Sequence, residues 1–294
     1  MDTAILSESL IIFGCGYIGC EIARRVKSIG WEVSALTRNT DTAANLKEMG
    51  VFVVEGNLHE PTWWNKLGPH EHIINCVGAF SPSQDGYRKS YLQGMESVVK
   101  WLKRASFRAK NLVFTSSSSV YPQIDHSLVD EKSDTSKASR RAQILLEAEN
   151  LCLQATGKMA ARSFVARYSG LYGPGRHLLV DKIRRGEAMQ GSPLRTLNLL
   201  HRDDAASSVI TMLRAPHEVQ GGVFNVCDGQ HATRGEIATW VAETLGVSPP
   251  EFIGAEEDRG PHRRVSNAKI CSDLGWKPNF PNFQTGYQDF LASE

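Results

Sequence analysis

The chain has 294 residues and a formal net charge of +1, with 33 Lys and Arg residues against 32 Asp and Glu residues. This length allows one large α/β domain, or a nucleotide-binding domain with a smaller appendage, that buries its core without disulfides or metals. The balanced charge argues against a nucleic-acid surface, and no apolar segment is long enough to span a membrane.

The first residues and the cysteines both favour a reducing compartment. Asp2 and Glu8 precede the first apolar run, and no basic segment accompanies them, so we expect no signal peptide and a cytoplasmic location. The six cysteines are scattered without a Cys-x-x-Cys pair, and we expect them to be free thiols.

Short apolar runs alternate with longer segments of helical period in the first part of the chain. This alternation is typical of βα units on a parallel sheet. The predicted strands cover residues 10–13, 32–36, 51–54, 72–77, 111–115 and 161–167. The predicted helices cover residues 17–29, a segment around Leu46 and Met49, 90–104 and 140–155, with a polar loop at 122–138.

The composition changes after about residue 170, where glycine, proline and histidine interrupt the chain more often. We therefore divide the chain into a dinucleotide-binding domain, residues 1–168, and a smaller substrate-binding region, residues 169–294. Within the second part, a strand at about 222–227 is expected to return to the main sheet, and 236–245 is predicted to be helical. No low-complexity linker separates the two parts.

The motif Gly-Cys-Gly-Tyr-Ile-Gly follows the first predicted strand and opens the first predicted helix, which is the arrangement of a dinucleotide site. Gly14 permits a sharp turn, Gly16 lets the backbone approach a pyrophosphate, and Gly19 lets the helix pack closely on the strand. The backbone at Tyr17 and Ile18 then presents the positive end of the helix to the anion. A purely structural glycine turn is the alternative.

The end of the second predicted strand indicates which dinucleotide is bound. A carboxylate at this position would hold the ribose of NAD, whereas an arginine accommodates the 2′-phosphate of NADP. The chain has Thr37 and Arg38 here and no carboxylate before Asp41, so we predict a preference for NADP over NAD. The alternatives are a solvated Arg38 with no ligand and, for the glycine turn, an FAD site.

Five further motifs occur in order along the chain. They are the serine-rich 114–122 ending in Val-Tyr-Pro, 167–176 with Tyr-Gly-Pro-Gly-Arg, 198–205 with Arg-Asp-Asp, 224–228 with Phe-Asn-Val, and 274–278 with Leu-Gly-Trp-Lys-Pro. As a set they resemble the extended short-chain dehydrogenase/reductases, and more narrowly the NAD-dependent epimerase/dehydratase family. The resemblance implies a Rossmann fold, a doubly wound parallel sheet with a small C-terminal substrate-binding region.

The resemblance also implies site residues. In that family a serine or threonine at the end of the fifth strand positions the substrate, and Ser117 fits this role with Ser118 beside it. Arg176, His177 and Arg264 are candidates for binding a small, anionic, nucleotide-sugar-like substrate, the alternative being an ordinary charged surface. Further cofactor contacts are expected near strand ends, at Asn57, Val77, Gly78, Thr115 and Ser116.

The expected Tyr-x-x-x-Lys pair of the family is missing. If Glu147 takes the place of the family's helix glutamate, Ser139 stands where the tyrosine belongs and Gln143 where the lysine belongs. Neither can serve as a proton donor near neutral pH or supply a charge that activates one. The glycine spacing also differs from the common Gly-x-x-Gly-x-x-Gly, and both departures indicate the atypical branch of the family.

Other groups could move the proton instead. Tyr91, on the helix after the fourth strand, is the candidate that we name, and packing of its ring on the core is the alternative. Further candidates are Lys137, Tyr168, Tyr172 and His201. Asp203 or Asp204 is expected to cap a helix that starts near residue 205. The histidines lack a metal-ligand spacing, so we expect no metal.

Two functions from different classes follow. The first is an NAD(P)-dependent oxidoreductase or epimerase that acts on a small-molecule substrate, with no nucleic-acid or membrane partner. The second is a non-catalytic NADP-binding or redox-sensing protein, which the missing Tyr/Lys pair favours. A flavin or other nucleotide binder ranks third. Helices 90–104 and 140–155 are candidates for a homodimer interface.

Overall fold

The computed structural model describes residues 8–257, 260 and 262–292. It divides into two compact units, each of which gathers separate stretches of the chain. The first unit comprises Met1–Val120, Ala138–Arg167 and Ala206–Phe224. The second unit comprises Tyr121–Lys137, Tyr168–Ala205 and Asn225–Glu294.

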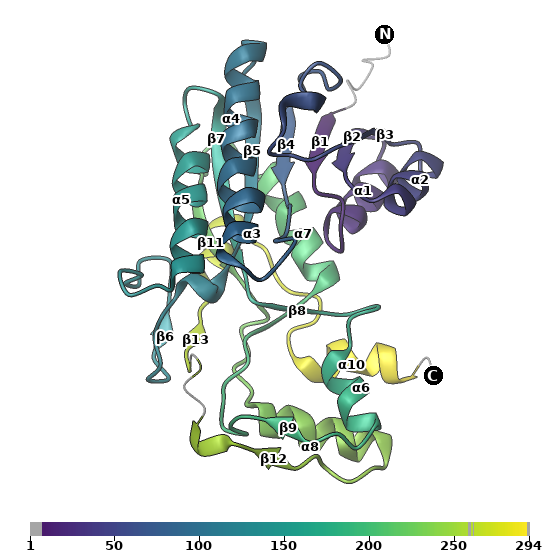
Figure 1. Cartoon of the computed structure of the whole chain (residues 1–294), viewed down its shortest axis with the longest axis vertical. Coiled ribbons are helices and arrows are strands. Elements are labelled where there is room, and N and C mark those ends of the chain that lie inside the picture. Colours follow the sequence, from purple (N-terminus) through teal and green to yellow (C-terminus); the bar gives the residue numbers. More distant parts are fainter. Residues whose placement is uncertain (1–7, 258–259, 261, 293–294) are drawn as a thin grey trace. The chain divides into compact units, whose positions relative to one another are not determined.

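A seven-stranded sheet with the order β11-β7-β5-β4-β1-β2-β3 organises the first unit (Figure 1). The strands are β1 (Ser9–Phe13), β2 (Glu32–Thr37), β3 (Phe52–Glu55), β4 (His72–Asn75), β5 (Ala109–Ser117), β7 (Ala160–Tyr168) and β11 (Gly222–Val226). Strands β3, β2, β1, β4 and β5 pair in parallel. This is the Rossmann-like α/β fold that the sequence predicts, including the return of β11 to the main sheet.

Strand β1 lies in the interior of the sheet, between β4 and β2, and its apolar residues are buried on both faces. Leu10, Ile11, Ile12 and Phe13 are fully buried, as continuous apolar runs are in parallel sheets. Phe13 is in register with Leu36 on β2 and with Asn75 on β4. The chain order reverses at β1, so the carboxyl ends of β1, β2 and β4 form the switch point where ligands bind in such sheets.

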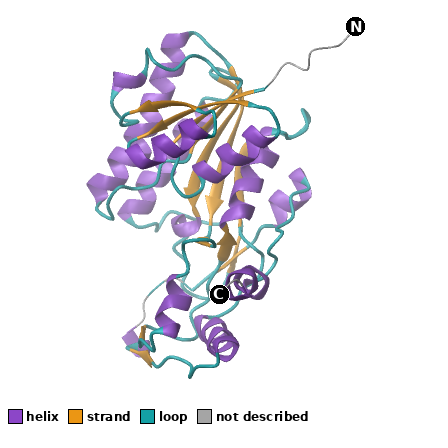
Figure 2. Cartoon of the chain, turned by 90° about the vertical axis from the view of Figure 1, so that its right-hand side faces the viewer, coloured by secondary structure: helices purple, strands orange, loops and turns teal. Residues whose placement is uncertain are grey.

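Helices cover both faces of this sheet (Figure 2). They include α1 (Gly19–Ser28), α2 (Thr40–Glu48), α4 (Gly94–Ala105), α5 (Arg140–Gln154) and α7 (Arg202–Leu213). Short 3₁₀ turns occur at Pro61–Trp63 and Ser118–Val120. None of the described helices combines the length and apolar character that a membrane-spanning segment requires.

Several element boundaries differ from the sequence prediction. The first helix begins at Gly19, because the two residues before it belong to the glycine turn. The fourth strand ends at Asn75, whose side-chain oxygen accepts a hydrogen bond from the Val77 N–H and so turns the chain. The helix predicted to start at 90 is preceded by α3 (Gln84–Tyr87) and a π-helical stretch, Arg88–Gln93, which continues into α4.

The second unit contains small two-stranded pairs and four helices. The strands are β6 (Leu128–Val129), β8 (Gly170–Tyr172), β9 (Met189–Gln190), β10 (Leu199–His201), β12 (Phe252–Ile253) and β13 (Arg264–Val265). They pair as β10-β8, β12-β9 and β13-β6. The helices are α6 (Leu178–Arg184), α8 (Arg234–Leu245), α9 (Ala268–Leu274) and α10 (Phe283–Ala292), with a 3₁₀ turn at Ala255–Glu257.

Tertiary contacts differ from the linear division at residue 168 in two stretches: Tyr121–Lys137 belongs to the second unit, and Ala206–Phe224 belongs to the first. Tyr121–Lys137 joins the second unit because β6 pairs with β13 and because the Glu131 carboxylate accepts a hydrogen bond from the Asn225 N–H at 2.7 Å. The core of the second unit contains Tyr172, Val180, Ile237, Val241, Phe283 and Tyr287. All six cysteines are free thiols, as expected.

Candidate functional site

The glycine turn after β1 has the backbone geometry that a close phosphate approach requires. Gly14 has φ of 89°, and a Cβ there would lie 2.7 Å from the backbone of Val77. A Cβ at Gly19 would lie 2.5 Å from the carbonyl oxygen of Gly14, so only glycine lets α1 pack this closely. At Gly16 no atom lies within 4 Å of the Cβ position. The open space beside the Gly16 backbone is where a pyrophosphate would approach.

The N-terminus of α1 follows this turn directly. Its N-cap residue, Ile18, offers no side-chain hydrogen bond to the first amides, which leaves the N-terminal backbone suited to an anion. Glu21 in the first turn is buried and binds Arg24 and Arg25, each at 2.6 Å. Burial works against ionisation, but the hydrogen bonds from the two arginines lower the pKa of Glu21 to about 2. The paired arginines therefore offset the carboxylate beside the helix end.

The end of β2 presents Thr37 and Arg38. Thr37 is buried and its hydroxyl accepts a hydrogen bond from the Asn39 N–H, while Asn39 caps α2 through the Thr42 N–H. Arg38 is exposed, and its guanidinium lies 5.7 Å from the ring centre of Phe80. Phe80 is itself 48% exposed, so this cation–π contact leaves Arg38 able to meet a ligand.

The loop after β4 is anchored by the π-helical stretch. The Tyr91 hydroxyl accepts a hydrogen bond from the Ala79 N–H at 3.2 Å, and the Ser90 hydroxyl accepts one from the Phe80 N–H. Burial raises the pKa of Tyr91. Val77 and Gly78 precede these anchored residues in the same loop. After β3, the Asn57 side chain donates to Glu60 at 2.9 Å.

The serines at the end of β5 have different surroundings. The Ser116 hydroxyl donates to Glu149 at 2.5 Å, and Glu149 forms a buried ion pair with Arg167 at 2.7 Å. Ser116 is therefore already engaged within the first unit. The Ser117 hydroxyl is partly exposed and accepts a hydrogen bond from the Ser119 N–H. Thr115 and Ser118 are buried on either side of them.

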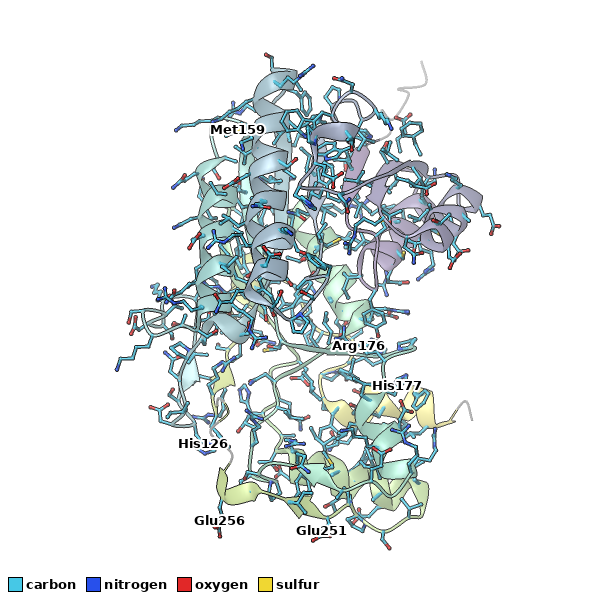
Figure 3. The ribbon with its side chains drawn as sticks, in the orientation of Figure 1. His126, Met159, Arg176, His177, Glu251 and Glu256 are labelled. Carbon is cyan, nitrogen blue, oxygen red and sulfur yellow. The ribbon has the colours of Figure 1, made fainter. Side chains whose placement is uncertain are left out.

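The substrate candidates Arg176, His177 and Arg264 lie in the second unit, and the first two are labelled in Figure 3. Arg176 is exposed on a turn closed by its N–H bond to the Gly173 oxygen. His177 is buried, with its ring stacked on Phe290 at 3.5 Å between centroids. Arg264 is exposed and donates to the His126 carbonyl.

Arg195 and Arg263 are two further arginines of the second unit that the sequence analysis does not name as substrate candidates. Arg263 is buried, and burial lowers its pKa to about 10, with the nearby Arg195 acting in the same direction. The Arg195 guanidinium packs where a side chain on Gly260 would stand. Burial alternates in this segment, because Arg263 and Val265 are buried while Arg264 between them is exposed, and this alternation is the signal that the sequence offered.

A family model for the NAD dependent epimerase/dehydratase family matches residues 10–227. The chain belongs to this family. Protein YeeZ of Escherichia coli K12 is 24% identical over 281 residues, covering 94% of this chain and 97% of YeeZ.

Two solved structures illustrate the epimerase/dehydratase fold. A Methylobacillus flagellatus protein provisionally assigned to the NAD-dependent epimerases/dehydratases is 27% identical, with a TM-score of 0.76 and 98% of both chains covered. MoeE5 in complex with UDP-glucose and NAD is 19% identical, with a TM-score of 0.81, covering 97% of this chain and 98% of MoeE5.

Two glutamates of α5 can serve as the reference from which the positions of the family's Tyr-x-x-x-Lys pair are counted. Glu147 is exposed, whereas Glu149 is the buried glutamate of α5. With Glu149 as the helix glutamate, the tyrosine and lysine positions fall on Arg141 and Leu145 instead of Ser139 and Gln143. Neither register contains a tyrosine or a lysine.

Three of the residues at these four positions form local hydrogen bonds, and the fourth, Leu145, is buried in the core. Ser139 caps α5 by accepting a hydrogen bond from the Ala142 N–H, and the Gln143 amide donates to the Ala138 oxygen. Arg141 donates to the Pro82 oxygen at 3.0 Å, and its guanidinium lies 5.6 Å from the Tyr87 ring.

The other aromatic and acidic candidates have packing partners in the second unit. The Tyr168 hydroxyl donates to the Ala205 oxygen, Tyr172 is buried against His201, and His201 packs on Phe280. The helix expected to start near residue 205 begins at Arg202. Asp203 and Asp204 therefore lie in its first turn, and Asp204 also accepts hydrogen bonds from the backbone of residues 279 and 280.

Proposed function

We propose that this chain binds NADP at the glycine turn of its first unit and acts as an oxidoreductase or epimerase. The substrate class that we propose is a small anionic molecule resembling a nucleotide sugar. One observation carries the cofactor site: the turn between β1 and α1 has two glycines that only fit without a Cβ, and open space beside the third, Gly16. Membership of the epimerase/dehydratase family supports a nicotinamide cofactor and an enzyme.

Arg38 supports NADP in preference to NAD. It stands at the end of β2, beside the partly exposed Phe80, and no carboxylate occupies this strand end. A guanidinium can pair with a 2′-phosphate through two hydrogen bonds, whereas a carboxylate would repel it. MoeE5 is in complex with NAD, so the proposed preference for NADP rests on Arg38 of this chain and not on that similarity.

The proposed holding residues surround the switch point of the sheet. The backbone from Gly14 to Gly19 would hold the pyrophosphate. Thr37 and Arg38 would hold the adenosine end of the cofactor. The loop that contains Val77 and Gly78 would lie beside the adenosine end. Asn57, Thr115 and Ser116 complete the proposed set. When bound, the nicotinamide supplies the hydride chemistry.

The chain's own residues would orient the substrate and move its proton. Ser117, partly exposed at the end of β5, would orient the substrate oxygen with Ser118 beside it. Tyr91 would donate the proton. Burial raises its pKa, which keeps the phenol protonated but makes it a weaker acid. In the second unit, Arg176, His177 and Arg264 remain proposed substrate residues. To these we add Arg263, which is buried, and Arg195, which is partly buried, as proposed anion ligands.

A non-catalytic NADP-binding protein is the second candidate. The observation that favours it is the absence of a tyrosine and a lysine from both registers of α5. Tyr91 also holds the loop after β4 through the Ala79 N–H, which is a structural role by itself.

Calorimetric titration with NADPH and NADH tests the cofactor site. Gly16→Val should weaken NADPH binding at least 100-fold without changing the thermal unfolding midpoint, because a side chain there fills only open space. Gly68→Val is the matched control, since Gly68 also has no atom within 4 Å of its Cβ position and lies away from the turn. Unchanged NADPH binding by Gly16→Val would refute the site. If NADPH binds but no carbonyl or alcohol substrate in a nucleotide-sugar screen is turned over, the non-catalytic candidate gains support.

A further inference from the structure

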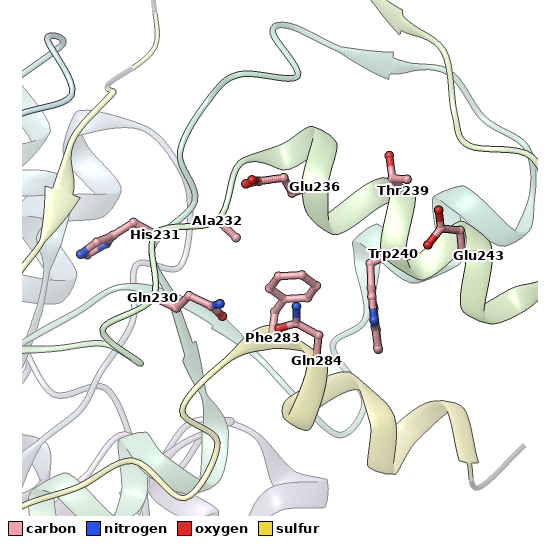
Figure 4. A pocket seen from close by; sticks show the side chains of 9 residues that line it. All are labelled: Gln230, His231, Ala232, Glu236, Thr239, Trp240, Glu243, Phe283 and Gln284. Carbon is pink, nitrogen blue, oxygen red and sulfur yellow. The ribbon is translucent and has the colours of Figure 1, made fainter.

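The second unit contains an open hollow of about 650 Å³ that none of the proposed cofactor or substrate residues lines (Figure 4). It lies between the loop before α8, one face of α8 and the start of α10. Its lining residues are Gln230, His231, Ala232, Glu236, Thr239, Trp240, Glu243, Phe283 and Gln284. We refer to it as the α8–α10 hollow.

The α8–α10 hollow is negatively charged. Glu236 and Glu243 are seven residues apart on α8, two helical turns, so both lie on the same face of the helix. Hydrogen bonds from the backbone and hydroxyl of Thr233 hold the pKa of Glu236 below its ordinary value. Burial lowers the pKa of His231, and the positive charge of Arg264 lowers it further, while the lining residues themselves include no lysine or arginine.

The hollow is also rich in hydrogen-bond acceptors that lack a donor. The side-chain oxygens of Gln230 and Gln284 are buried and have no hydrogen-bond partner. The Nδ1 atom of His231 is also buried without a partner, and it accepts a hydrogen bond in the tautomer that carries the proton on Nε2. Buried acceptors are normally paired, so a ligand whose N–H groups reach these atoms would satisfy them.

Two aromatic rings complete the wall. Trp240 and Phe283 meet edge to face, with their ring centroids 5.5 Å apart. Figure 4 shows both side chains at the hollow, with Glu243 on the same helix as Trp240. An indole face next to carboxylates attracts organic cations, which combine a charge with an apolar body.

We infer that the α8–α10 hollow binds a small organic cation with several N–H donors, an aliphatic amine or a guanidinium. The carboxylates neutralise the charge, the glutamine oxygens and His231 accept the N–H groups, and Trp240 and Phe283 cover the hydrocarbon part. A phosphate or carboxylate ligand is excluded by the two glutamates. This site is independent of the proposed dinucleotide site.

Calorimetric titration of the full chain with agmatine, which carries a guanidinium and an ammonium group, tests the inference. We expect binding, and a loss of affinity of tenfold or more in both Glu236→Gln and Glu243→Gln. Glutamine can replace Glu236 in the capping box with Thr233, so α8 should remain intact. Glu251→Gln, an exposed glutamate of the same unit outside the hollow, is the matched control and should bind agmatine like the unchanged chain.

Neutral n-butylurea separates charge from hydrogen bonding, because it keeps N–H donors and an apolar chain without the cation. It should bind at least tenfold more weakly than agmatine. No agmatine binding, equal binding by the glutamate variants and the Glu251→Gln control, or equal binding of n-butylurea would each overturn the inference. Gly16→Val should bind agmatine unchanged, which distinguishes failure of this site from failure of the dinucleotide site.

Discussion

At the residue scale, Arg38 and Glu149 show that burial decides whether a charged side chain contributes to ligand binding or to folding stability. Arg38 is exposed, and its guanidinium lies over the ring of the partly exposed Phe80, so its removal should affect ligand binding more than folding. Glu149 is 3% exposed and accepts hydrogen bonds from Ser116 and Arg167, so its removal should affect folding. Glu147 has the same side chain two positions earlier on α5 but faces solvent.

Arg38→Ala should weaken NADPH binding by roughly 10–100-fold, because a charge-assisted pair with a phosphate contributes about 1.5–3 kcal/mol. NADH lacks the 2′-phosphate and should lose less than about threefold. Parallel titrations measure both affinities, with the exposed Arg108→Ala as control. Equal losses for the two cofactors would remove the argument for NADP.

Glu149→Gln should lower the free energy of unfolding by about 3–5 kcal/mol, because it removes the carboxylate charge that pairs with the buried Arg167 guanidinium. Glu147→Gln should change it by less than about 0.5 kcal/mol. Urea unfolding of both variants measures the difference. A similar small effect in both would mean that the ion pair of Arg167 contributes little.

At the element scale, the β1–α1 segment combines close packing at two glycines with a carboxylate that is paired with arginines. At Gly14 the turn packs against Val77, and at Gly19 the start of α1 packs against the carbonyl oxygen of Gly14. Glu21 stands in the first turn of α1, where a carboxylate favours the helix but would compete with an anionic ligand. Arg24 and Arg25 bind this carboxylate, so the helix keeps its stabilising charge while the two guanidinium groups offset the repulsion of an anionic ligand.

The pKa of Glu21 predicts how α1 contributes to stability with pH. Its folded pKa of about 2 is below the ordinary value of 4.5, so the stabilisation is complete above about pH 4.5 and is lost as the pH falls towards 2. Glu21→Gln should therefore lower the unfolding midpoint at pH 7 more than at pH 3. Thermal unfolding at both pH values tests this, with Glu48→Gln, exposed at the end of α2, as control. The same loss at both pH values would contradict it.

At the scale of the whole molecule, residues that are far apart in the sequence come together through the sheet. The proposed cofactor residues follow β1, β2, β3, β4 and β5 and all belong to the first unit. The charged and aromatic candidates Arg176, His177, Arg195, Arg263 and Arg264 belong to the second unit. A dinucleotide ligand should therefore stabilise the first unit through several strand ends at once.

NADPH at a concentration of 100 times its Kd should stabilise the native chain by about 2.7 kcal/mol, a rise of roughly 4–5 °C in the unfolding midpoint of a chain of 294 residues. NADH at the same concentration should give a smaller rise, and the midpoint of Gly16→Val should rise by less than about 1 °C with either cofactor. Differential scanning fluorimetry over a range of cofactor concentrations measures this. A rise of equal size in Gly16→Val would place the ligand away from the glycine turn.

The sequence by itself determined the Rossmann-like sheet, the return of β11 and the position of the glycine turn. These depend on local patterns: buried apolar runs, helical periods, and glycines between a strand and a helix. It also determined that no Tyr-x-x-x-Lys pair is present, because this is a matter of residue identity. It did not determine the start of α1 or the π-helical stretch at Tyr91, since the backbone there follows packing and side-chain hydrogen bonds.

Only the tertiary structure decided which charges are buried and which partners they have. Glu149 and not Glu147 binds Arg167, Arg263 and not Arg264 is buried, and Tyr121–Lys137 joins the second unit. The α8–α10 hollow likewise depends on α10 lying against α8, about 40 residues later in the chain. The physical reason is the same in each case: the energy of a buried charge or an unpaired acceptor is set by neighbours that are distant in sequence, and local patterns contain no information about them.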